Sequence, residues 1–249
     1  MNAPADDLVL VTGGGTGIGL GIAETLTRAG RRVIITGRRR DVLEAAQGRL
    51  GTLAHWRVHD VDRVDEAEGF VSQLEKDFGP ITALVNNAGK HHKRATVDHS
   101  IADFVAVVHT NLIAVFALTQ ACGRRMLTRK RGSIVMISSM TAQMGLTEVA
   151  GYSASKTALI GLARVCAVEW SGQGVRVNVV CPGFIETDIF RKVRAQDPTR
   201  IERILSRIPM HRPGTGEDVG SMVAYLCSDE ASYVTGSVFN VDGGFAVAF

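Results

Sequence analysis

The sequence lacks a long uninterrupted apolar run, and its first residues lack the features of a signal peptide. No apolar run reaches the roughly 18 residues that a helix needs to span a bilayer. Residues 1–7 contain neither a basic start nor an apolar core. We therefore expect no membrane partner and a cytoplasmic location. The net charge is also small, at +3 over 249 residues, so no nucleic-acid partner is expected.

Cysteine is scarce, and the sequence contains no recognisable metal motif. The four cysteines lie far apart among apolar neighbours, which is typical of reduced, buried thiols: Cys122, Cys166, Cys181 and Cys227. The neighbouring His91 and His92 would point to opposite sides of an extended segment, so they are not expected to share a metal. The motifs HExxH and GxSxG are absent, which argues against zinc proteases and α/β-hydrolases.

Short β-branched runs alternate with helix-length segments along the chain. The runs are residues 8–11, 32–36, 54–58, 82–86, 133–137, 175–180 and 237–241. The helical segments are roughly residues 17–29, 40–50, 63–78, 101–129, 152–171 and 217–228. This alternation predicts an α/β fold with a doubly wound, parallel seven-stranded sheet and helices on both faces. The length and the 45% hydrophobic content suit a single domain over residues 1–249.

A glycine-rich turn follows the first run and opens the first helix. Its sequence is Thr12-Gly13-Gly14-Gly15-Thr16-Gly17-Ile18-Gly19. Glycine lets backbone N–H groups approach a ligand, and the helix N-terminus adds partial positive charge, so a pyrophosphate would bind well here. A tight turn alone would also explain the glycines, but the strand before and the helix after favour dinucleotide binding.

The segment after the second run bears on the choice of dinucleotide. It reads Thr36-Gly37-Arg38-Arg39-Arg40, with no acid before Asp41. An acid here would bind a ribose 2′-hydroxyl, whereas a guanidinium can bind a 2′-phosphate through two charged hydrogen bonds. The sequence therefore favours NADP(H) over NAD(H), with Arg38 and Arg39 as candidate phosphate contacts. A solvated arginine cluster at the start of a helix is the alternative.

Ser139, Tyr152 and Lys156 have a spacing that suits proton transfer. Tyr152 and Lys156 lie four residues apart in a predicted helix and therefore share one face. A free phenol titrates near pH 10, and a neighbouring cation stabilises its phenolate. The three groups could therefore perform acid/base chemistry at a carbonyl. Taken alone, a solvated tyrosine–lysine pair on a helix would explain the same spacing.

Taken together and in order, these motifs resemble the short-chain dehydrogenase/reductase family over nearly the whole chain. The matching segments are the glycine turn, Asp60-Val61, Asn86-Asn87-Ala88-Gly89, Asn111, Ser139, Tyr152 with Lys156, and Pro182-Gly183 with Thr187. The resemblance implies a single-domain Rossmann fold with a substrate lid at about residues 186–210. It also implies an NAD(P)-dependent enzyme that interconverts a ketone and a secondary alcohol by hydride transfer.

The resemblance implies a role for each of four catalytic residues. Tyr152 would be the general acid/base, and Lys156 would lower its pKa and hold the nicotinamide ribose. Ser139 would hydrogen-bond the substrate oxygen. Asn111 would support a water that links Lys156 to a proton relay. These roles agree with the need for donors already aimed at a developing alkoxide.

The resemblance also implies the cofactor contacts. Asp60 would accept from the adenine amino group, Val61 would pack beside the ring, and Ile185 and Thr187 would hold the nicotinamide carboxamide. The full expected set is Gly13, Gly15, Thr16, Gly17, Ile18, Gly19, Arg38, Arg39, Asp60, Val61, Asn87, Ala88, Gly89, Tyr152, Lys156, Pro182, Gly183, Ile185 and Thr187.

The substrate is less constrained than the reaction. The expected substrate contacts are Ser139, Gln143, Tyr152 and Gly183, with specificity set by Gln143, Met144, Leu146, Glu148 and the lid. Cations in the segments 90–94 and 190–194 suggest an anionic substrate, although a solvated surface explains them equally well. The segments 182–188 and 228–236 look like those of 3-oxoacyl-thioester reductases. The loop at 90–94 looks like that of sugar and sugar-acid dehydrogenases. The polar Gln143 and Glu148 favour a small polar or anionic keto or hydroxy compound.

The helical segments 101–129 and 152–171 are apolar over more than one face and therefore need cover on two sides. The family resemblance implies that these helices join subunits, so we expect a homotetramer, with a dimer as the alternative. A catalytically silent NADP-binding regulator would need fewer of the four catalytic residues. A nucleic-acid-binding protein would rest on scattered arginines alone.

Overall fold

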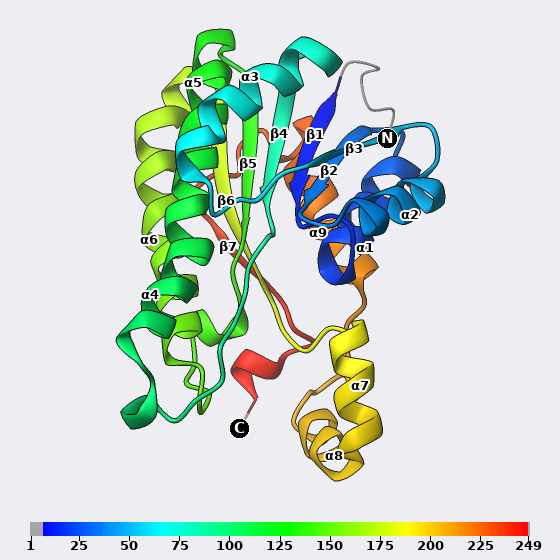
Figure 1. The fold of residues 1–249 in the computed structure, drawn as a ribbon, viewed down its shortest axis with the longest axis vertical. Coiled ribbons are helices and arrows are strands. Elements are labelled where there is room, and N and C mark those ends of the chain that lie inside the picture. The colour runs from blue at the N-terminus through cyan, green and yellow to red at the C-terminus, as the bar shows by residue number, and fades with distance from the viewer. Residues whose placement is uncertain (1–6, 249) are drawn as a thin grey trace.

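The computed structural model describes residues 7–248 and contains one parallel sheet with helices on both faces (Figure 1). The strand order is β3-β2-β1-β4-β5-β6-β7, and every neighbouring pair is parallel. This confirms the predicted α/β Rossmann-like fold with its doubly wound seven-stranded sheet. Residues 1–6 and residue 249 lie outside the described residues. Most of the amino-terminal segment that lacks signal-peptide features is therefore not described.

The predicted elements are present with small shifts at their ends. The strands are β1 (Leu8–Thr12), β2 (Arg32–Gly37), β3 (Ala54–Val58), β4 (Ile81–Asn86), β5 (Gly132–Ile137), β6 (Val175–Pro182) and β7 (Val238–Val241). The helices are α1 (Gly17–Arg28), α2 (Arg40–Leu50), α3 (Ala67–Phe78), α4 (Ile101–Val108), α5 (Ala114–Arg129), α6 (Ala150–Trp170), α7 (Asp188–Gln196), α8 (Pro198–Ser206) and α9 (Gly216–Leu226). The largest shift is at α3, because Val64–Glu66 form a separate 3-10 turn before it.

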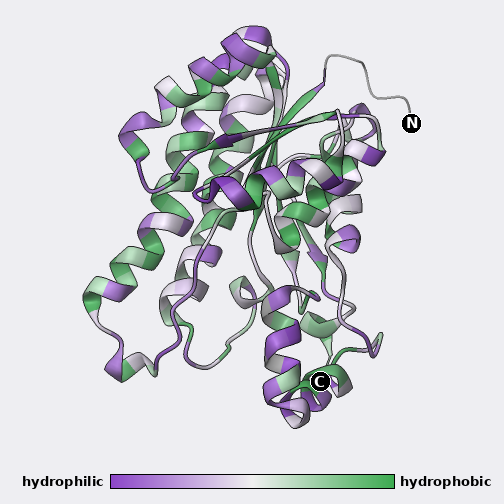
Figure 2. Ribbon diagram, turned by 45° about the vertical axis from the view of Figure 1, so that its right-hand side comes forward, coloured by the Kyte–Doolittle hydropathy of each residue, from purple (hydrophilic) through white to green (hydrophobic). Residues whose placement is uncertain are grey.

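Alternate residues of each strand enter two separate cores. Leu8 and Leu10 of β1 pack with α3, α5 and α6, whereas Val9 and Val11 pack with α1, α2 and α9. Successive side chains of a strand point to opposite faces, so a sheet covered on both sides needs apolar residues at every position. The central strands β1, β4 and β5 are accordingly mostly apolar, and many polar residues lie on the outer helix faces (Figure 2).

The strand order indicates where a ligand-binding crevice should lie. β1 lies between β2 and β4, so the connections that leave β1 and β4 diverge to opposite sides of the sheet. A crevice opens at the carboxyl ends of the strands where the connections diverge, and α/β proteins of this kind bind ligands there. The glycine turn, the segment after β4 and the residues after β5 all reach this edge.

Helix α4, a π-helical turn at His109–Ile113 and α5 form one continuous helix from Ile101 to Arg129. By length and composition this helix could cross a membrane, with a mean hydropathy of 2.0 over 18 residues. Polar residues such as Asp103 and Asn111 interrupt this helix, which is why the sequence shows no uninterrupted apolar run of this length. In the fold, the inner side of the helix belongs to the core, through residues such as Val115, Leu118 and Met126.

The chain leaves the sheet after β6 and forms α7 and α8 in the segment predicted as a substrate lid, which is called the lid below. Helices α7 and α8 project beyond the carboxyl edge of the sheet, and the last turn of the chain lies beside them (Figure 1). A small apolar cluster of Met140, Ile208 and Phe245 holds the lid, and Ile204 and Leu205 of α8 pack against it. The lid is thus attached through a cluster that is separate from the two main cores.

Candidate active site

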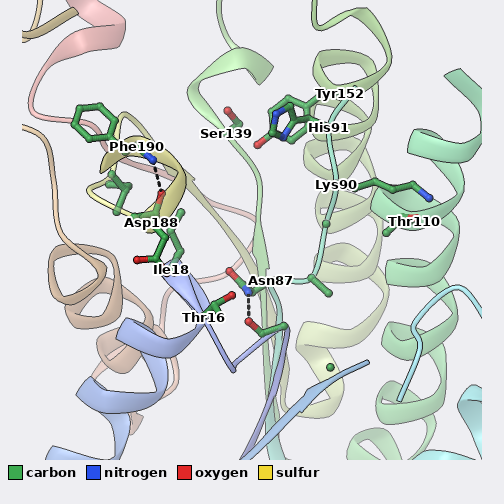
Figure 3. Close-up of a pocket in the computed structure, with 18 of the residues that line it drawn as sticks. Thr16, Ile18, Asn87, Lys90, His91, Thr110, Ser139, Tyr152, Asp188 and Phe190 are labelled. Atoms are coloured by element: carbon green, nitrogen blue, oxygen red, sulfur yellow. Dashed lines mark hydrogen bonds between the residues drawn. The ribbon is translucent and has the colours of Figure 1, made fainter. Parts of the chain in front are cut away.

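A cavity of about 940 Å³ lies at the carboxyl edge of the sheet and below the lid. It is lined from Arg38 and Asp60 at one end, past the glycine turn, to Ser139 and Tyr152 at the other. Figure 3 shows Thr16 and Ile18 on one side and Tyr152 with His91 on the other. This volume is at the upper end of the range for small-molecule sites, and the cavity is long enough to join the two predicted sites.

The glycine turn is built so that its backbone faces the cavity. A Cβ on Gly19 would lie 2.3 Å from the carbonyl oxygen of Gly13, so only glycine permits this close approach. Asn87 Nδ2 donates to the carbonyl oxygens of Thr12 at 2.9 Å and Gly13 at 3.2 Å (Figure 3). The N-cap residue Thr16 makes no side-chain hydrogen bond to the first turn of α1 within the described chain. That turn can therefore offer its N–H groups to a phosphate.

The three arginines after β2 have different surroundings. Arg38 and Arg39 line the cavity and have no ion-pair partner among the described residues. Arg40 points elsewhere, with its guanidinium 5.0 Å from the Trp56 ring and 3.7 Å from a carboxylate oxygen of Glu44. The first two arginines therefore remain available for a phosphate, and the third covers the start of α2.

The cavity wall beside these arginines suits an adenosine. Asp60 and Val61 both line the cavity, as expected. Thr36 also lines it, and its fully buried hydroxyl has no hydrogen-bond partner within residues 7–248. A buried hydroxyl without a partner carries a desolvation cost that a ligand can offset. The residues at this end of the cavity therefore fit a dinucleotide.

At the other end of the cavity, two elements bring the acid/base groups together. Ser139 follows β5, and Tyr152 lies in the first turn of α6 with Lys156 one turn later. The Lys156 Nζ atom lies 5.7 Å from the centroid of the Tyr152 ring and donates a hydrogen bond to the Ile137 carbonyl oxygen at 2.6 Å. The spacing of four residues therefore places both groups on one helix face, as predicted.

Burial dominates the electrostatics of this end of the cavity. It lowers the pKa of Lys156 from 10.5 to about 8. It also raises the pKa of Tyr152, and the nearby Ser139 hydroxyl acts in the opposite direction. Burial is therefore the largest influence on the Tyr152 pKa and outweighs the groups that lower it. A phenol that holds its proton at neutral pH is a proton donor, which suits carbonyl reduction.

Asn111 lies in the π-helical turn and is fully buried. Its amide clamps the loop after β4, because Nδ2 donates to the Lys90 carbonyl at 2.8 Å and Oδ1 accepts from the Lys90 N–H at 2.9 Å. A Cβ on Gly89 would lie 3.1 Å from Asn111 Oδ1 and 3.6 Å from Lys156 Nζ. Glycine at this position keeps the space between these two polar side chains open.

The loop after β4 alternates its side chains, as its extended conformation predicts. His91 lines the cavity, and its ring meets that of Tyr152 edge-on with 6.2 Å between centroids. His92 points away and contacts His99, with 2.9 Å between His92 Nδ1 and His99 Nε2. Burial and the neighbouring Lys93 lower the pKa of His91, so its imidazole is neutral at neutral pH.

Several expected site residues lie elsewhere. Gln143 is outside the cavity lining, because its amide exchanges two hydrogen bonds with Asn240 of β7, at 2.7 and 3.0 Å. Met144 packs against the lid cluster, and Glu148 is likewise outside the lining. Of the expected cofactor contacts, Pro182 and Lys156 are buried behind the wall and the others line the cavity.

Two of the lid cations have partners on their own segment. Arg191 forms an ion pair with Asp188, and Arg194 forms one with Glu186 at 3.1 Å. Neither arginine lines the cavity, and Lys192 does not line it either. Of the two explanations for the cations at residues 191–194, these contacts favour a solvated surface over an anion site.

The structure adds lining residues that the sequence did not single out. They include His59, Thr110, Thr141, Phe190 and Arg200. Arg200 and Ile204 both line the cavity and lie one helical turn apart on α8. Their spacing of four residues was therefore the sequence signal that could have identified them as lining residues. Within the described part of the chain, no three His, Cys, Asp or Glu side chains lie close enough together to hold a metal ion.

Comparison with known proteins extends these observations. Residues 13–246 match the family model described as Enoyl-(Acyl carrier protein) reductase. The chain is 36% identical over 237 residues to the 3-oxoacyl-[acyl-carrier-protein] reductase FabG of Escherichia coli K12, covering 95% of this chain and 96% of that protein. It is 37% identical over 241 residues to the 2-dehydro-3-deoxy-D-gluconate 5-dehydrogenase of Bacillus subtilis 168, covering 95% and 93% of the two chains.

Among solved structures, the chain is similar to a single-residue variant of actinorhodin polyketide ketoreductase with NADPH. The TM-score is 0.93, the identity is 35%, and the match covers 99% of this chain and 100% of that one. The family match, the similarity to these relatives and the shared fold lead to the same assignment. The chain belongs to the short-chain dehydrogenase/reductase family and is an NAD(P)-dependent oxidoreductase acting on alcohol and carbonyl groups.

Proposed function

We propose that this protein uses NADP(H) to interconvert a ketone and a secondary alcohol on a small polar or anionic substrate, such as a sugar or a sugar acid. The observation that carries this proposal is the single cavity that joins the glycine turn and Arg38 to Ser139 and Tyr152. We further propose that residues 1–249 act as one domain, with the lid at about residues 186–210.

The proposed reaction assigns one step to each side chain at the catalytic end. Bound NADPH supplies the hydride. Tyr152 donates its phenolic proton to the carbonyl oxygen, and the Ser139 hydroxyl hydrogen-bonds the same oxygen. Lys156, charged below its pKa of about 8, stabilises the phenolate that remains. Asn111 holds the loop after β4 in place and would support the water of the proton relay.

The proton-transfer role can be tested by replacing Tyr152 with phenylalanine. Tyr152→Phe should lower kcat by about 10²- to 10⁴-fold, because it removes the general acid, while the Kd for NADPH changes little. Oxidation of NADPH at 340 nm and fluorescence titration measure the two quantities. Full activity of Tyr152→Phe would rule out this role. A wild-type protein that binds NADPH but reduces no keto-sugar acid, keto acid or 3-oxoacyl thioester would instead be a regulator.

The cofactor preference rests on Arg38 and Arg39. Arg38→Asp should weaken NADPH binding by tens of fold and leave NADH binding nearly unchanged, because a carboxylate repels the 2′-phosphate. Arg40→Asp is the matched control, since Arg40 contacts Trp56 and Glu44 instead of the cavity. If Arg38→Asp weakened both cofactors equally, the preference for NADP(H) would lose its basis.

A 3-oxoacyl-thioester reductase is the second candidate. The E. coli relative carries that name, and apolar side chains that could follow an acyl chain line the substrate half of the cavity: Met140, Leu146, Val149, Phe184 and Ile204. A comparison of kcat/KM for acetoacetyl-CoA and for a keto-sugar acid would separate the two candidates.

We also infer that the protein forms a homotetramer, with a dimer as the alternative, and acts in the cytoplasm. Support for the assembly comes from the outer faces of the long helix and α6, which expose large apolar side chains: Ile101, Val105, Ile113, Phe116, Val165 and Val168. Support for a reducing compartment comes from the four free cysteines, all of which are buried.

A further inference from the structure

The cations around the cavity divide into those that already have a carboxylate partner and those that do not. Lys90 lies 3.5 Å from Asp62, and the lid residues Arg191 and Arg194 pair with acids on their own segment. An arginine or lysine that is already paired has less to gain from an incoming anion. These three side chains are therefore poor candidates for substrate binding.

Lys93 and Arg200 are different. Both line the cavity, both are exposed, and neither has an ion-pair partner among the residues that the structure describes. An exposed cation needs no partner for folding, but two such cations facing one cavity concentrate positive potential there. They belong to opposite walls, the loop after β4 and the lid.

The wall that carries Lys93 is held at several points. Asn111 clamps the backbone of Lys90, and His92 contacts His99. The Arg94 N–H donates to the Glu148 carbonyl at 3.0 Å. Lys93 follows His91 by two residues and shares its side of the loop, and His91 meets the Tyr152 ring. The Lys93 ammonium is therefore presented near the reacting end of the cavity.

The wall that carries Arg200 is fixed by the packing of α8. The Asp197 carboxylate caps this helix by accepting from the Arg200 N–H at 2.9 Å. Ile201 is buried, and Ile204 packs against the lid cluster. Arg200 and Ile204 lie on the same helix face and both line the cavity. The guanidinium is thus presented from the lid side, above an apolar patch.

The carboxylates that line the cavity lie away from Lys93 and Arg200 or are already paired. The acids that line it are Asp60, Asp62 and Asp188. Asp60 and Asp62 lie at the adenosine end, and the latter accepts from Thr110 at 2.5 Å and contacts Lys90. Asp188 pairs with Arg191. An anion between Lys93 and Arg200 would therefore meet two cations and no free carboxylate of the described lining.

We propose that Lys93 and Arg200 bind a carboxylate of the substrate, so that the natural substrate is a small hydroxy or keto acid. This inference rests on the proposed function, because it places the acid in the cavity where Tyr152 acts. A carrier-bound thioester could bring a phosphate to the same cations. A carboxylate fits better, since Lys93 lies two residues from His91, whereas the phosphates of a pantetheine carrier are many bonds from the carbonyl.

The test compares an acid with its uncharged amide in the presence of saturating NADP⁺. Isothermal titration calorimetry measures the binding of D-gluconate and D-gluconamide, and of 3-hydroxybutyrate and its amide. The wild-type protein should bind at least one acid about tenfold more tightly than its amide. Lys93→Gln and Arg200→Gln should each weaken that acid by about 5- to 20-fold and leave the amide unchanged.

Matched controls lie beside each residue. Arg94 and Arg203 are on the same two segments but do not line the cavity, so Arg94→Gln and Arg203→Gln should change acid binding by less than about twofold. In steady-state assays, the two test variants should raise KM for the acid more than they change kcat, because the contact holds the substrate equally in the ground and transition states.

Four results would overturn the proposal. The first is that acid and amide bind equally in both pairs, and the second is that the control variants lose as much acid affinity as the test variants. The third is that Arg200→Gln binds NADP⁺ more weakly than wild type. The fourth is that the two substitutions weaken binding only of acetoacetyl-CoA, and not of its neutral N-acetylcysteamine thioester or of the acids. The last would assign the cations to a carrier phosphate. Acid-selective binding without turnover of any alcohol would instead contradict the proposed function and leave the carboxylate site standing.

Discussion

Lys156 shows how a single buried charge opposes stability in order to serve chemistry. Its side chain is almost fully buried and donates to the Ile137 carbonyl oxygen, and burial lowers its pKa to about 8 from 10.5. Holding the ammonium in its charged form inside the fold therefore costs free energy. From the size of the pKa difference, this cost is about 3 kcal/mol below pH 8.

The cost predicts a specific pH dependence of stability. Below pH 8 both the folded and the unfolded states carry the proton, and the whole cost is present. Between pH 8 and 10.5 the folded state loses its proton first, so the cost disappears. The free energy of unfolding of Lys156→Met, relative to wild type, should therefore fall by about 3 kcal/mol over this interval. Urea denaturation at pH 7, 9 and 10.5 measures it.

The absolute stability of Lys156→Met also includes the lost hydrogen bond to Ile137, but that contribution does not change with pH. Lys76→Met is a suitable control, because Lys76 is exposed on α3. The difference in the free energy of unfolding between Lys76→Met and wild type should stay constant from pH 7 to pH 10.5. If the free energy of unfolding changed with pH in the same way for Lys156→Met and wild type, the Lys156 ammonium would be as well solvated in the fold as in water.

The lid depends on the last turn of the chain. Phe245 is 4% exposed and meets the Phe184 ring edge-on, with 5.2 Å between centroids. Together with Met140 and Ile208 it forms the cluster that receives α8. Because this cluster is separate from both main cores, we expect the proposed lid to open without unfolding of the sheet.

Removing the Phe245 ring should therefore release the lid selectively. Phe245→Ala should speed tryptic cleavage at the lid arginines by about tenfold or more and lower kcat/KM, while the main thermal transition changes little. Limited proteolysis followed by mass spectrometry locates the cuts. Val247→Ala is the control, since Val247 is 79% exposed. Equal protection of the lid in both variants would show that the cluster does not hold it.

The elements of the site differ in how far the sequence could predict them. The glycine turn and the pair Tyr152 and Lys156 were predictable, because their geometry depends on residues within one or two turns. The pairing of Arg191 with Asp188 was also readable, since they lie three residues apart in a helix. Gln143 was not, because its partner Asn240 is 97 residues away.

The pKa of Tyr152 was unpredictable for a related reason. The sequence shows the neighbouring lysine, but it does not show how much of the cavity wall covers the phenol. The strands and the helices around the sheet were predictable to within a few residues, because most of them have a strong local pattern, whereas α7 and α8 were not predicted as helices. The glycine turn indicates where the cofactor half of the cavity lies.

The whole molecule exposes an apolar stripe that a monomer would leave in water. Val168 is 86% and Ile101 is 78% exposed, on α6 and α4, and such a stripe is typical of an interface between subunits. Val168→Asp should therefore shift the assembly from the proposed tetramer to a smaller species. Size-exclusion chromatography with light scattering measures the mass. Val58→Asp, on a 47% exposed valine of β3, should leave the assembly unchanged, and a monomeric wild type would refute the tetramer.

The position of the turn Phe245–Val247 has a practical consequence. The turn Phe245–Val247 lies against the lid, at the end of the molecule that holds the cavity, whereas β1 begins at the opposite end of the sheet (Figure 1). An affinity tag or fusion partner inserted directly after Val247 would lie close to Phe245 and crowd the proposed lid. Any protein made for assays or crystallisation should carry its tag at the amino terminus.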